Sequence, residues 1–202
     1  MSLLMHIHNR PRPIYFTRHG ESMFNVEDKV GGNPDLSERG YAYTIKLNQF
    51  FQEEMKQRNI NKNTKMFCST LQRTIKTAGA IDVGLKATRL KMLDEIHSGS
   101  FDGMTYSEIS KLYPNDAQER AADKLRYRYP NGESYVDVIQ RIEPVIFAIE
   151  KSKEPIIIVT LFNKSILINC RLRIKQLSGV YMPISASQIL RRFLIFQFLF
   201  IQ

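Results

Sequence analysis

The residues Arg18-His19-Gly20-Glu21 directly follow a short apolar run at residues 14–17, and they are the part of the sequence best suited to chemistry. An imidazole titrates near neutral pH and can act as a nucleophile. The neighbouring guanidinium of Arg18 is a permanently charged, planar donor that matches the oxygens of a phosphoryl group. Gly20 lets the backbone turn, so His19 is expected at the carboxyl end of a strand, where open α/β sheets place their ligands. The pattern predicts an anion site with a nucleophilic histidine.

The elements expected around this junction alternate between strands and helices. Further strands are expected at residues 65–68, 88–90 and 156–159, the last a continuous apolar run typical of a central parallel strand. Helices are expected at residues 37–58, 69–81, 106–112, 116–127 and 135–151. Ser37 is expected to cap the first of these helices, whose apolar residues recur at helical spacing: Ile45, Leu47, Phe50, Phe51 and Met55. This alternation predicts a three-layer α/β sandwich with a mostly parallel sheet.

The composition is that of an ordinary soluble protein with one α/β domain. The chain has 202 residues, of which 43% are hydrophobic and 24% charged. Its two cysteines, Cys68 and Cys170, form no Cys-x-x-Cys pattern, so neither a disulfide scaffold nor a zinc site is expected and the predicted location is cytoplasmic. Residues 1–13 lack the apolar core of a secretory signal, and no stretch of about eighteen apolar residues could span a membrane.

The net charge of +9 is unevenly distributed along the chain. All 20 acidic residues and 23 of the 29 basic residues lie within residues 1–154, which leaves a net charge of +3 there and +6 on the last 48 residues. The small positive charge of the main body suits the attraction of a small polyanion. Basic and aromatic side chains are not interleaved in the last part, so nucleic-acid binding is the function least favoured.

The element at Arg18-His19-Gly20-Glu21, followed by Asn25, resembles the signature of the histidine phosphatase (phosphoglycerate mutase-like) superfamily. A closer resemblance, from about residue 4 to residue 159, is to the bisphosphatase half of the bifunctional 6-phosphofructo-2-kinase/fructose-2,6-bisphosphatases. The matching segments are Leu36-Ser37-Glu38-Arg39-Gly40, Arg73-Thr74-Ile75-Lys76-Thr77, Leu93-Asp94-Glu95-Ile96, Met104-Thr105-Tyr106, Tyr127-Arg128-Tyr129-Pro130 and Gly132-Glu133-Ser134-Tyr135. The last two segments are specific to this family, whereas Arg-His-Gly marks only the superfamily.

The resemblance implies a role for each matching residue. His19 would take the 2-phosphoryl group, Arg18 and Arg73 would hold its oxygens, and Glu95 would act as general acid and then as base. The implied substrate-binding residues are Asn25, Gly31, Tyr106, Arg120, Lys124 and Tyr135. No metal or cofactor is implied, since arginines would hold the phosphoryl charge. A Gly-x-x-x-x-Gly-Lys-Ser/Thr segment is missing from the sequence, so the kinase half and ATP binding are not expected.

Each of these residues, taken alone, has a simpler explanation. Arg73 could be a solvated helix arginine and Glu95 a surface acid, while the tyrosines could be packing residues. Arg120 and Lys124 could form an exposed charged face at i, i+4 on a helix. Their joint occurrence in the order found in the family favours the functional interpretation.

The resemblance ends at residue 160. The family would have a second histidine directly after the strand at 156–159, then Gln and Arg, where this chain has Thr160, Leu161 and Ser165. No histidine follows His97, which is a remote candidate for compensation. The predicted organisation is a linker-like segment at 1–12, an incomplete phosphatase domain at 13–159 and a basic, apolar tail at 160–202, as a variant transcript or a frameshifted gene model would produce.

The predicted activity is hydrolysis of fructose 2,6-bisphosphate to fructose 6-phosphate and phosphate through a phosphohistidine at His19, slowed by the loss of the second histidine. Two alternatives stay open: a broader phosphomonoesterase of the same superfamily, and a pseudophosphatase that binds a bisphosphorylated sugar without turnover. The expected partner is a small sugar bisphosphate, not nucleic acid or a membrane. The chain is expected to be a monomer or a weak dimer.

Overall fold

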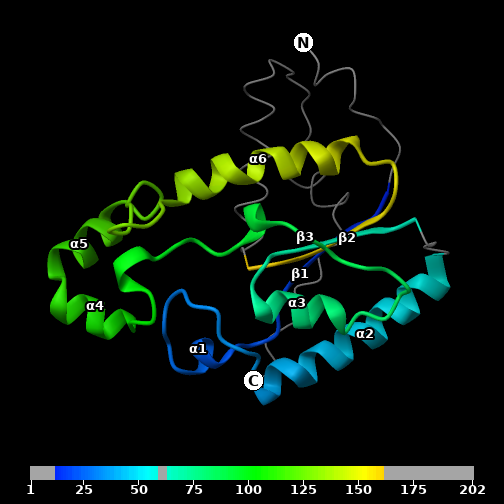
Figure 1. Ribbon diagram of the computed structural model, residues 1–202, viewed down its shortest axis with the longest axis horizontal. Helices are drawn as coiled ribbons and strands as arrows, with labels where there is room; N and C mark the ends of the chain where they lie inside the picture. Colours follow the sequence, from blue (N-terminus) through cyan, green and yellow to red (C-terminus); the bar gives the residue numbers. More distant parts are fainter. Residues whose placement is uncertain (1–11, 59–62, 162–202) are drawn as a thin grey trace, which may run out of the picture.

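The computed structural model describes residues 12–58 and 63–161, and its centre is a parallel sheet (Figure 1). Four strands, β1 (Ile14–Arg18), β2 (Lys65–Cys68), β3 (Thr88–Arg89) and β4 (Ile156–Thr160), pair in the order β1-β4-β2-β3. Strand β4 pairs with β1 on one side and β2 on the other, and all five of its residues are buried. Because the strands run parallel, β4 brings the carboxyl ends of β1 and β2 to the same edge of the sheet.

Helices cover both faces of this sheet. Helices α2 (Glu38–Arg58) and α3 (Gln72–Gly79) lie on one face and α6 (Tyr135–Lys151) lies on the other (Figure 1). Successive residues of a strand point to opposite faces, so β1, β2 and β4 each contribute to two apolar clusters. The α6 cluster contains Ile14, Ile156 and Ile158, and the cluster with α2 and α3 contains Tyr15, Ile157 and Val159. The predicted three-layer α/β sandwich with a parallel sheet is confirmed.

Capping explains where several helices begin. Ser134 accepts a hydrogen bond from the backbone N–H of Asp137, whose side chain binds the Ser134 backbone in return, and α6 spans the predicted residues. Thr105 and Glu108 form the same arrangement at the start of α4 (Tyr106–Leu112), which is also the predicted helix. The short helix α1 (Met23–Val26), capped by Ser22, was not predicted.

The bounds of some elements and the exposure of one residue differ from the sequence-based expectations. Helix α3 begins at Gln72 and not at residue 69, because the Ser69 hydroxyl accepts the Leu71 N–H and forms a turn. Helix α5 (Pro114–Ala122) ends five residues earlier than predicted, because the Asp123 carboxylate accepts backbone N–H groups beyond the helix. Ile45 is 61% exposed, since it lies two positions from the buried Leu47 and therefore faces another side of α2.

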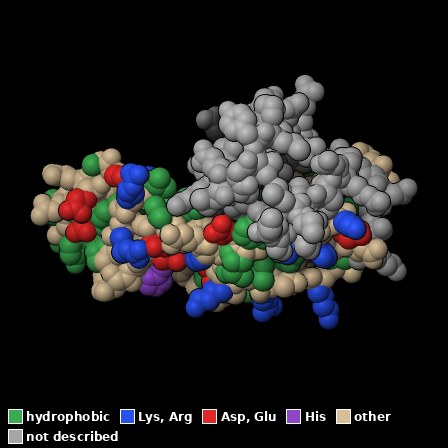
Figure 2. Space-filling view, turned by 90° about the horizontal axis from the view of Figure 1, so that it is seen from above, with side chains coloured by type: hydrophobic (Ala, Val, Ile, Leu, Met, Phe, Trp, Pro, Cys, Tyr) green, Lys and Arg blue, Asp and Glu red, His purple; other side chains and the backbone are tan. Residues whose placement is uncertain are grey.

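Helices α4 and α5 form one end of the molecule, beyond the sheet (Figure 1). Basic and acidic side chains are interspersed at this end in the space-filling view (Figure 2). Within the described ranges, no helix combines the length and the apolar character that crossing a membrane requires. The tail predicted from residue 160 lies outside the described residues beyond Leu161, as does nearly all of the predicted linker at 1–12.

Candidate active site

His19 follows the last residue of β1, and one of its ring nitrogens has no hydrogen-bond partner among the described residues. Its backbone N–H donates to the Thr160 carbonyl at 3.2 Å, which ties the end of β1 to the end of β4. Its Nδ1 lies 2.5 Å from the carbonyl oxygen of Gly20. A carbonyl oxygen can only accept a hydrogen bond, so Nδ1 carries the proton and Nε2 carries the lone pair. Nε2 is buried and makes no hydrogen bond to any described residue.

The charge state of His19 is set by its surroundings. Burial and the neighbouring guanidinium groups of Arg18 and Arg73 lower the pKa of His19 to about 3, against the opposing hydrogen bond to Gly20. The ring is therefore neutral near pH 7. A neutral imidazole with a defined tautomer and a free Nε2 lone pair is the form that can attack phosphorus.

Two arginines lie beside this histidine. Arg73, in the first turn of α3, is 3% exposed, and its Nη1 donates to the Gly32 carbonyl at 2.9 Å. Arg18, the last residue of β1, is exposed, and its guanidinium makes no hydrogen bond or ion pair to another residue in ranges 12–58 and 63–161. Its charge nevertheless acts on both His19 and Arg73. Two guanidinium groups around a neutral imidazole form a site that favours an anion.

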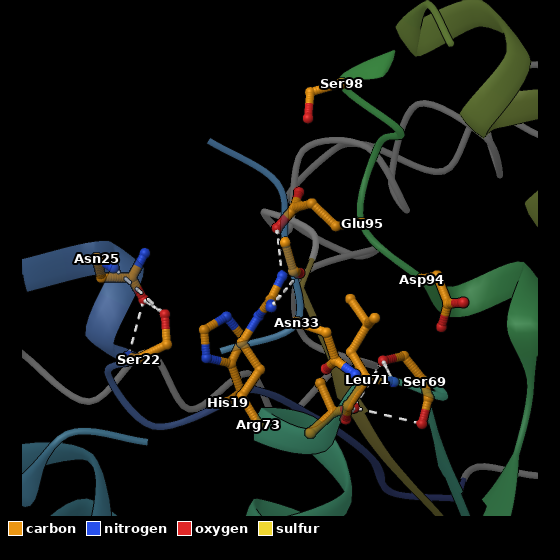
Figure 3. Close-up of polar contacts among 12 residues, drawn as sticks. His19, Ser22, Asn25, Asn33, Ser69, Leu71, Arg73, Asp94, Glu95 and Ser98 are labelled. Carbon is orange, nitrogen blue, oxygen red and sulfur yellow. Dashed lines mark hydrogen bonds and ion pairs between the residues drawn. The ribbon is translucent and has the colours of Figure 1, made fainter. Parts of the chain in front are cut away.

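Glu95 completes this group from a different part of the chain. Its Oε2 lies 3.8 Å from Nη2 of Arg73, and the close-up shows the carboxylate directed at that guanidinium (Figure 3). Burial raises the pKa of Glu95, and the opposing attraction of Arg73 and Arg18 only reduces this effect. A carboxyl group that keeps its proton to a higher pH than usual suits a general acid. The four residues predicted to be catalytic are thus brought together.

Asn25, predicted to bind the substrate, also stabilises the start of α1. It is the third residue of α1, and its Oδ1 accepts hydrogen bonds from the backbone N–H and the hydroxyl of Ser22, each at 3.0 Å (Figure 3). Its Nδ2 makes no hydrogen bond to another described residue. The amide can therefore cap α1 with its oxygen and offer its nitrogen to a ligand.

Gly31 was predicted to be a substrate-binding residue, and the structure gives another reason for a glycine at this position. Its φ is +71°, a conformation that side chains rarely adopt, and an added Cβ would lie 1.8 Å from Oδ1 of Asp102. That oxygen accepts the Gly32 N–H at 2.7 Å, while the Gly32 carbonyl accepts from Arg73. The glycine loop therefore packs against protein and orients Arg73.

A second candidate anion site, formed by Arg120 and two tyrosines, lies between α4, α5 and the segment that precedes α6. The guanidinium carbon of Arg120 lies 4.9 Å from the Tyr106 ring centre and 5.8 Å from that of Tyr129. Its Nε donates to the Tyr129 hydroxyl at 2.9 Å and its Nη2 to the Tyr106 hydroxyl at 3.3 Å. These side chains line a cavity of about 290 Å³. Tyr129 was not singled out from the sequence as a site residue, although it belongs to the Tyr-Arg-Tyr-Pro segment.

Tyr135 lies near enough to both Glu95 and Arg120 for their charges to act on its hydroxyl group, whereas Lys124 lies apart from these residues. Burial raises the pKa of Tyr135, and the nearby carboxyl group of Glu95 raises it further. Lys124 is exposed in a turn after the end of α5 and makes no hydrogen bond or ion pair within the described part of the chain. Its predicted i, i+4 relation to Arg120 on one helix is wrong, because α5 ends at Ala122.

Thr160 occupies the place at which the second histidine was expected. It is 2% exposed, ends β4 and pairs with Arg18 across the sheet. His97 is exposed, and it is its backbone that contacts Glu133. Among the described residues, no group of three or more His, Cys, Asp or Glu side chains could hold a metal ion.

Comparisons with known proteins identify the family of this chain. The model of the histidine phosphatase superfamily (branch 1) matches residues 14–165. The chain is 46% identical over 157 residues to a 6-phosphofructo-2-kinase/fructose-2,6-bisphosphatase of Arabidopsis thaliana, which covers 78% of this chain and 21% of that protein. It is 45% identical over 155 residues to a fructose-2,6-bisphosphatase of Saccharomyces cerevisiae, which covers 77% of this chain and 33% of the relative. The chain thus spans only a fifth to a third of the length of these curated relatives.

Solved structures show the same fold. A mycobacterial glucosyl-3-phosphoglycerate phosphatase has a TM-score of 0.64 at 24% identity, with 77% of each chain covered. An α-ribazole phosphatase from Shigella flexneri has a TM-score of 0.63 at 22% identity, with 83% of this chain and 80% of the other covered.

Proposed function

Because the chain belongs to the histidine phosphatase superfamily, as its sequence indicates, we propose that it hydrolyses the 2-phosphate of fructose 2,6-bisphosphate through a phosphohistidine at His19. Relatives that are named fructose-2,6-bisphosphatase support this substrate. The observation that carries the proposal is the neutral His19, with its Nε2 lone pair free among the described residues, beside two guanidinium groups and a carboxyl group of raised pKa.

In the proposed first step, Nε2 of His19 attacks phosphorus and the bond between phosphorus and the C2 oxygen breaks. Glu95 donates its proton to the departing oxygen, which leaves as the C2 hydroxyl of fructose 6-phosphate. Arg18 and Arg73 hold the charge on the phosphoryl oxygens during transfer.

In the second step a water molecule attacks the phosphohistidine, and the Glu95 carboxylate takes a proton from that water. The bond between phosphorus and Nε2 breaks, and inorganic phosphate leaves. His19 returns to its neutral form and Glu95 to its protonated form, so both groups are ready for another turnover. Dividing the hydrolysis into two transfers replaces one difficult attack by two easier ones.

The second phosphate of the substrate would bind at Arg120. This guanidinium is held between two tyrosine rings and already donates to their hydroxyl groups. It would therefore present a fixed positive charge to the 6-phosphate, with Tyr106 and Tyr135 next to the sugar hydroxyls. Lys124 would have to approach from the turn after α5 to contribute.

Thr160 would make this chain slower than relatives that carry a histidine there. A threonine offers one hydroxyl group, without positive charge and with a shorter reach. The loss of one preorganised donor to developing charge typically costs about 10²–10³ in rate. Among the described residues Thr160 is the reason to consider a pseudophosphatase, because His19, Arg18, Arg73 and Glu95 are all present.

The test is to incubate the purified chain with fructose 2,6-bisphosphate and to measure both phosphate release and acid-labile phosphoprotein. We expect both signals from the wild-type chain and from His97→Gln, and neither from His19→Gln. Equal rates with simple alkyl phosphates would instead favour a broader phosphomonoesterase. Saturable sugar-phosphate binding without any phosphohistidine would favour the pseudophosphatase.

A further inference from the structure

The guanidinium of Arg141, in the middle of α6, binds the segment that carries Glu95. Its Nη1 donates to the Met92 carbonyl at 2.6 Å. Its Nη2 donates to the carbonyl of Asp94 at 2.8 Å and to that of Glu95 at 2.9 Å. The side chain therefore binds three backbone carbonyl groups of one short stretch, including that of the proposed general acid itself.

Glu133 binds both the guanidinium of Arg141 and the backbone of His97, at the end of the segment 92–97 that carries Glu95. Its Oε1 accepts from Nε of Arg141 at 2.8 Å and its Oε2 from Nη2 at 3.1 Å. The same Oε2 accepts the backbone N–H of His97 at 3.0 Å, and the Glu133 N–H donates to the His97 carbonyl at 2.9 Å. Arg141 and Glu133 together thus bind the segment 92–97 both before and after Glu95.

The remaining residues of the segment are also held in place. The Asp94 carboxylate accepts the backbone N–H of Thr70 at 2.7 Å and its hydroxyl at 2.6 Å, which joins the segment to the turn before α3. Leu93 and Ile96, on either side, are buried in the core cluster that includes residues of α6. The Glu95 carboxyl group is left directed at Arg73 (Figure 3).

We propose that Arg141, with Glu133 as its counter-ion, is a positioning residue that sets where the Glu95 carboxyl group lies relative to the departing oxygen. This inference rests on the proposed function, because it assigns Arg141 an effect on proton transfer to the leaving group. A lysine could not replace it, since one ammonium group cannot reach three carbonyl oxygens and a carboxylate in the plane that a guanidinium serves.

The expected effect depends on how much the leaving group needs a proton. General acid catalysis contributes about 10²–10⁴ in rate, and a displacement of about 1 Å can cost about 10². Arg141→Lys should therefore slow hydrolysis of fructose 2,6-bisphosphate by about 10- to 100-fold through kcat. Release of 2,4-dinitrophenolate from 2,4-dinitrophenyl phosphate in the first turnover should stay within about threefold of the wild type, because this phenolate leaves without a proton and its transfer step uses His19 and the arginines but not the acid.

The experiment compares the rate of the first turnover with both substrates in four chains: wild type, Arg141→Lys, Glu133→Gln and Arg126→Lys. The last is the matched control, since Arg126 is exposed and its guanidinium pairs with the neighbouring Asp123 alone in the described part of the chain. A loss of rate in Arg141→Lys and Glu133→Gln with the sugar bisphosphate, but not with the aryl phosphate, supports the proposal. The rate with the sugar bisphosphate should also depend less on pH in the range where the acid loses its proton. An equal loss with both substrates, or no loss at all, overturns it.

A measurement without turnover separates this proposal from the proposed function. If the wild type hydrolyses neither ester, the proposed function fails, while amide hydrogen exchange and the titration of Glu95 followed by NMR still decide the role of Arg141. Faster exchange at residues 92–97 and a changed Glu95 titration in Arg141→Lys, with Arg126→Lys unchanged, support positioning. Identical exchange and titration in Arg141→Lys and the wild type contradict it.

Discussion

Replacing His19 by Gln should remove a large part of the sensitivity of this protein to acid. The folded state lowers the pKa of this histidine from 6.5 to about 3, mainly because the ring is buried. Between these two values the unfolded chain binds a proton that the folded chain does not, so the free energy of unfolding falls as the pH falls. Above pH 6.5 both states are neutral, and His19 imposes no such penalty.

The size of the effect follows from the two pKa values. Each pKa unit corresponds to about 1.4 kcal/mol, so the complete loss between pH 6.5 and pH 3 is about 5 kcal/mol, and the loss by pH 4.5 is about 3 kcal/mol. This is a large share of the roughly 5–15 kcal/mol that stabilises a typical domain. Glutamine has no titratable group, so the His19→Gln chain should keep this amount at pH 4.5.

Urea unfolding of the wild type, His19→Gln and His97→Gln at pH 7.5 and pH 4.5 measures this difference. The buffer must be free of phosphate, since an anion that binds the folded state would stabilise it. We expect wild type and His97→Gln to lose about 3 kcal/mol more than His19→Gln on acidification. His97 is the matched control because its side chain is exposed. Equal losses in all three chains would show that His19 is not held neutral by its surroundings.

Three further predictions concern other parts of the molecule. Gly31→Ala should lower the free energy of unfolding by about 1–3 kcal/mol, because the residue has a positive φ and the added methyl group would meet Asp102. Gly79→Ala in α3, where the space around the glycine is open, should raise the free energy of unfolding by about 0.5–1 kcal/mol. Thermal unfolding of both variants checks this. Arg120→Met should raise KM for fructose 2,6-bisphosphate by about 10- to 100-fold and leave the KM for aryl phosphates unchanged, and an equal effect on both would contradict a 6-phosphate site. Thr160→His should raise the rate of phosphate release by about 10² or more, and unchanged turnover would show that this position does not limit the reaction.

Local patterns in the sequence predicted most elements of the fold. Helix α6 could be bounded because Ser134 caps it and its apolar residues recur at helical spacing. Strand β4 was predicted one residue short, since Thr160 breaks the apolar run yet still pairs with Arg18. The end of α5 was missed because the Asp123 carboxylate forms a turn through local hydrogen bonds that hydrophobic periodicity does not reveal.

The candidate site depends on contacts that no local pattern contains. The junction of Arg18 and His19 is visible in the sequence, but the pairing of Arg73 with Glu95 was expected only through the resemblance to a family. That pairing requires the strands to align so that the first turn of α3 meets the segment that carries Glu95. Arg141 carried no signal at all, because its partners are mainly backbone carbonyl groups, and these are the same for every residue type.

The strand order also determines when during synthesis the core can assemble. Strands β1 and β2 do not pair with each other, and each instead pairs with β4, which begins only at Ile156. Until the ribosome has released that segment, both strands present unpaired edges, and such edges promote association between chains. Folding must therefore await pairings between residues more than 140 positions apart, such as Ile14 with Ile156, which predicts slow formation of the sheet. A nascent chain stopped before β4 would carry His19 and Arg73 but could not bring them together.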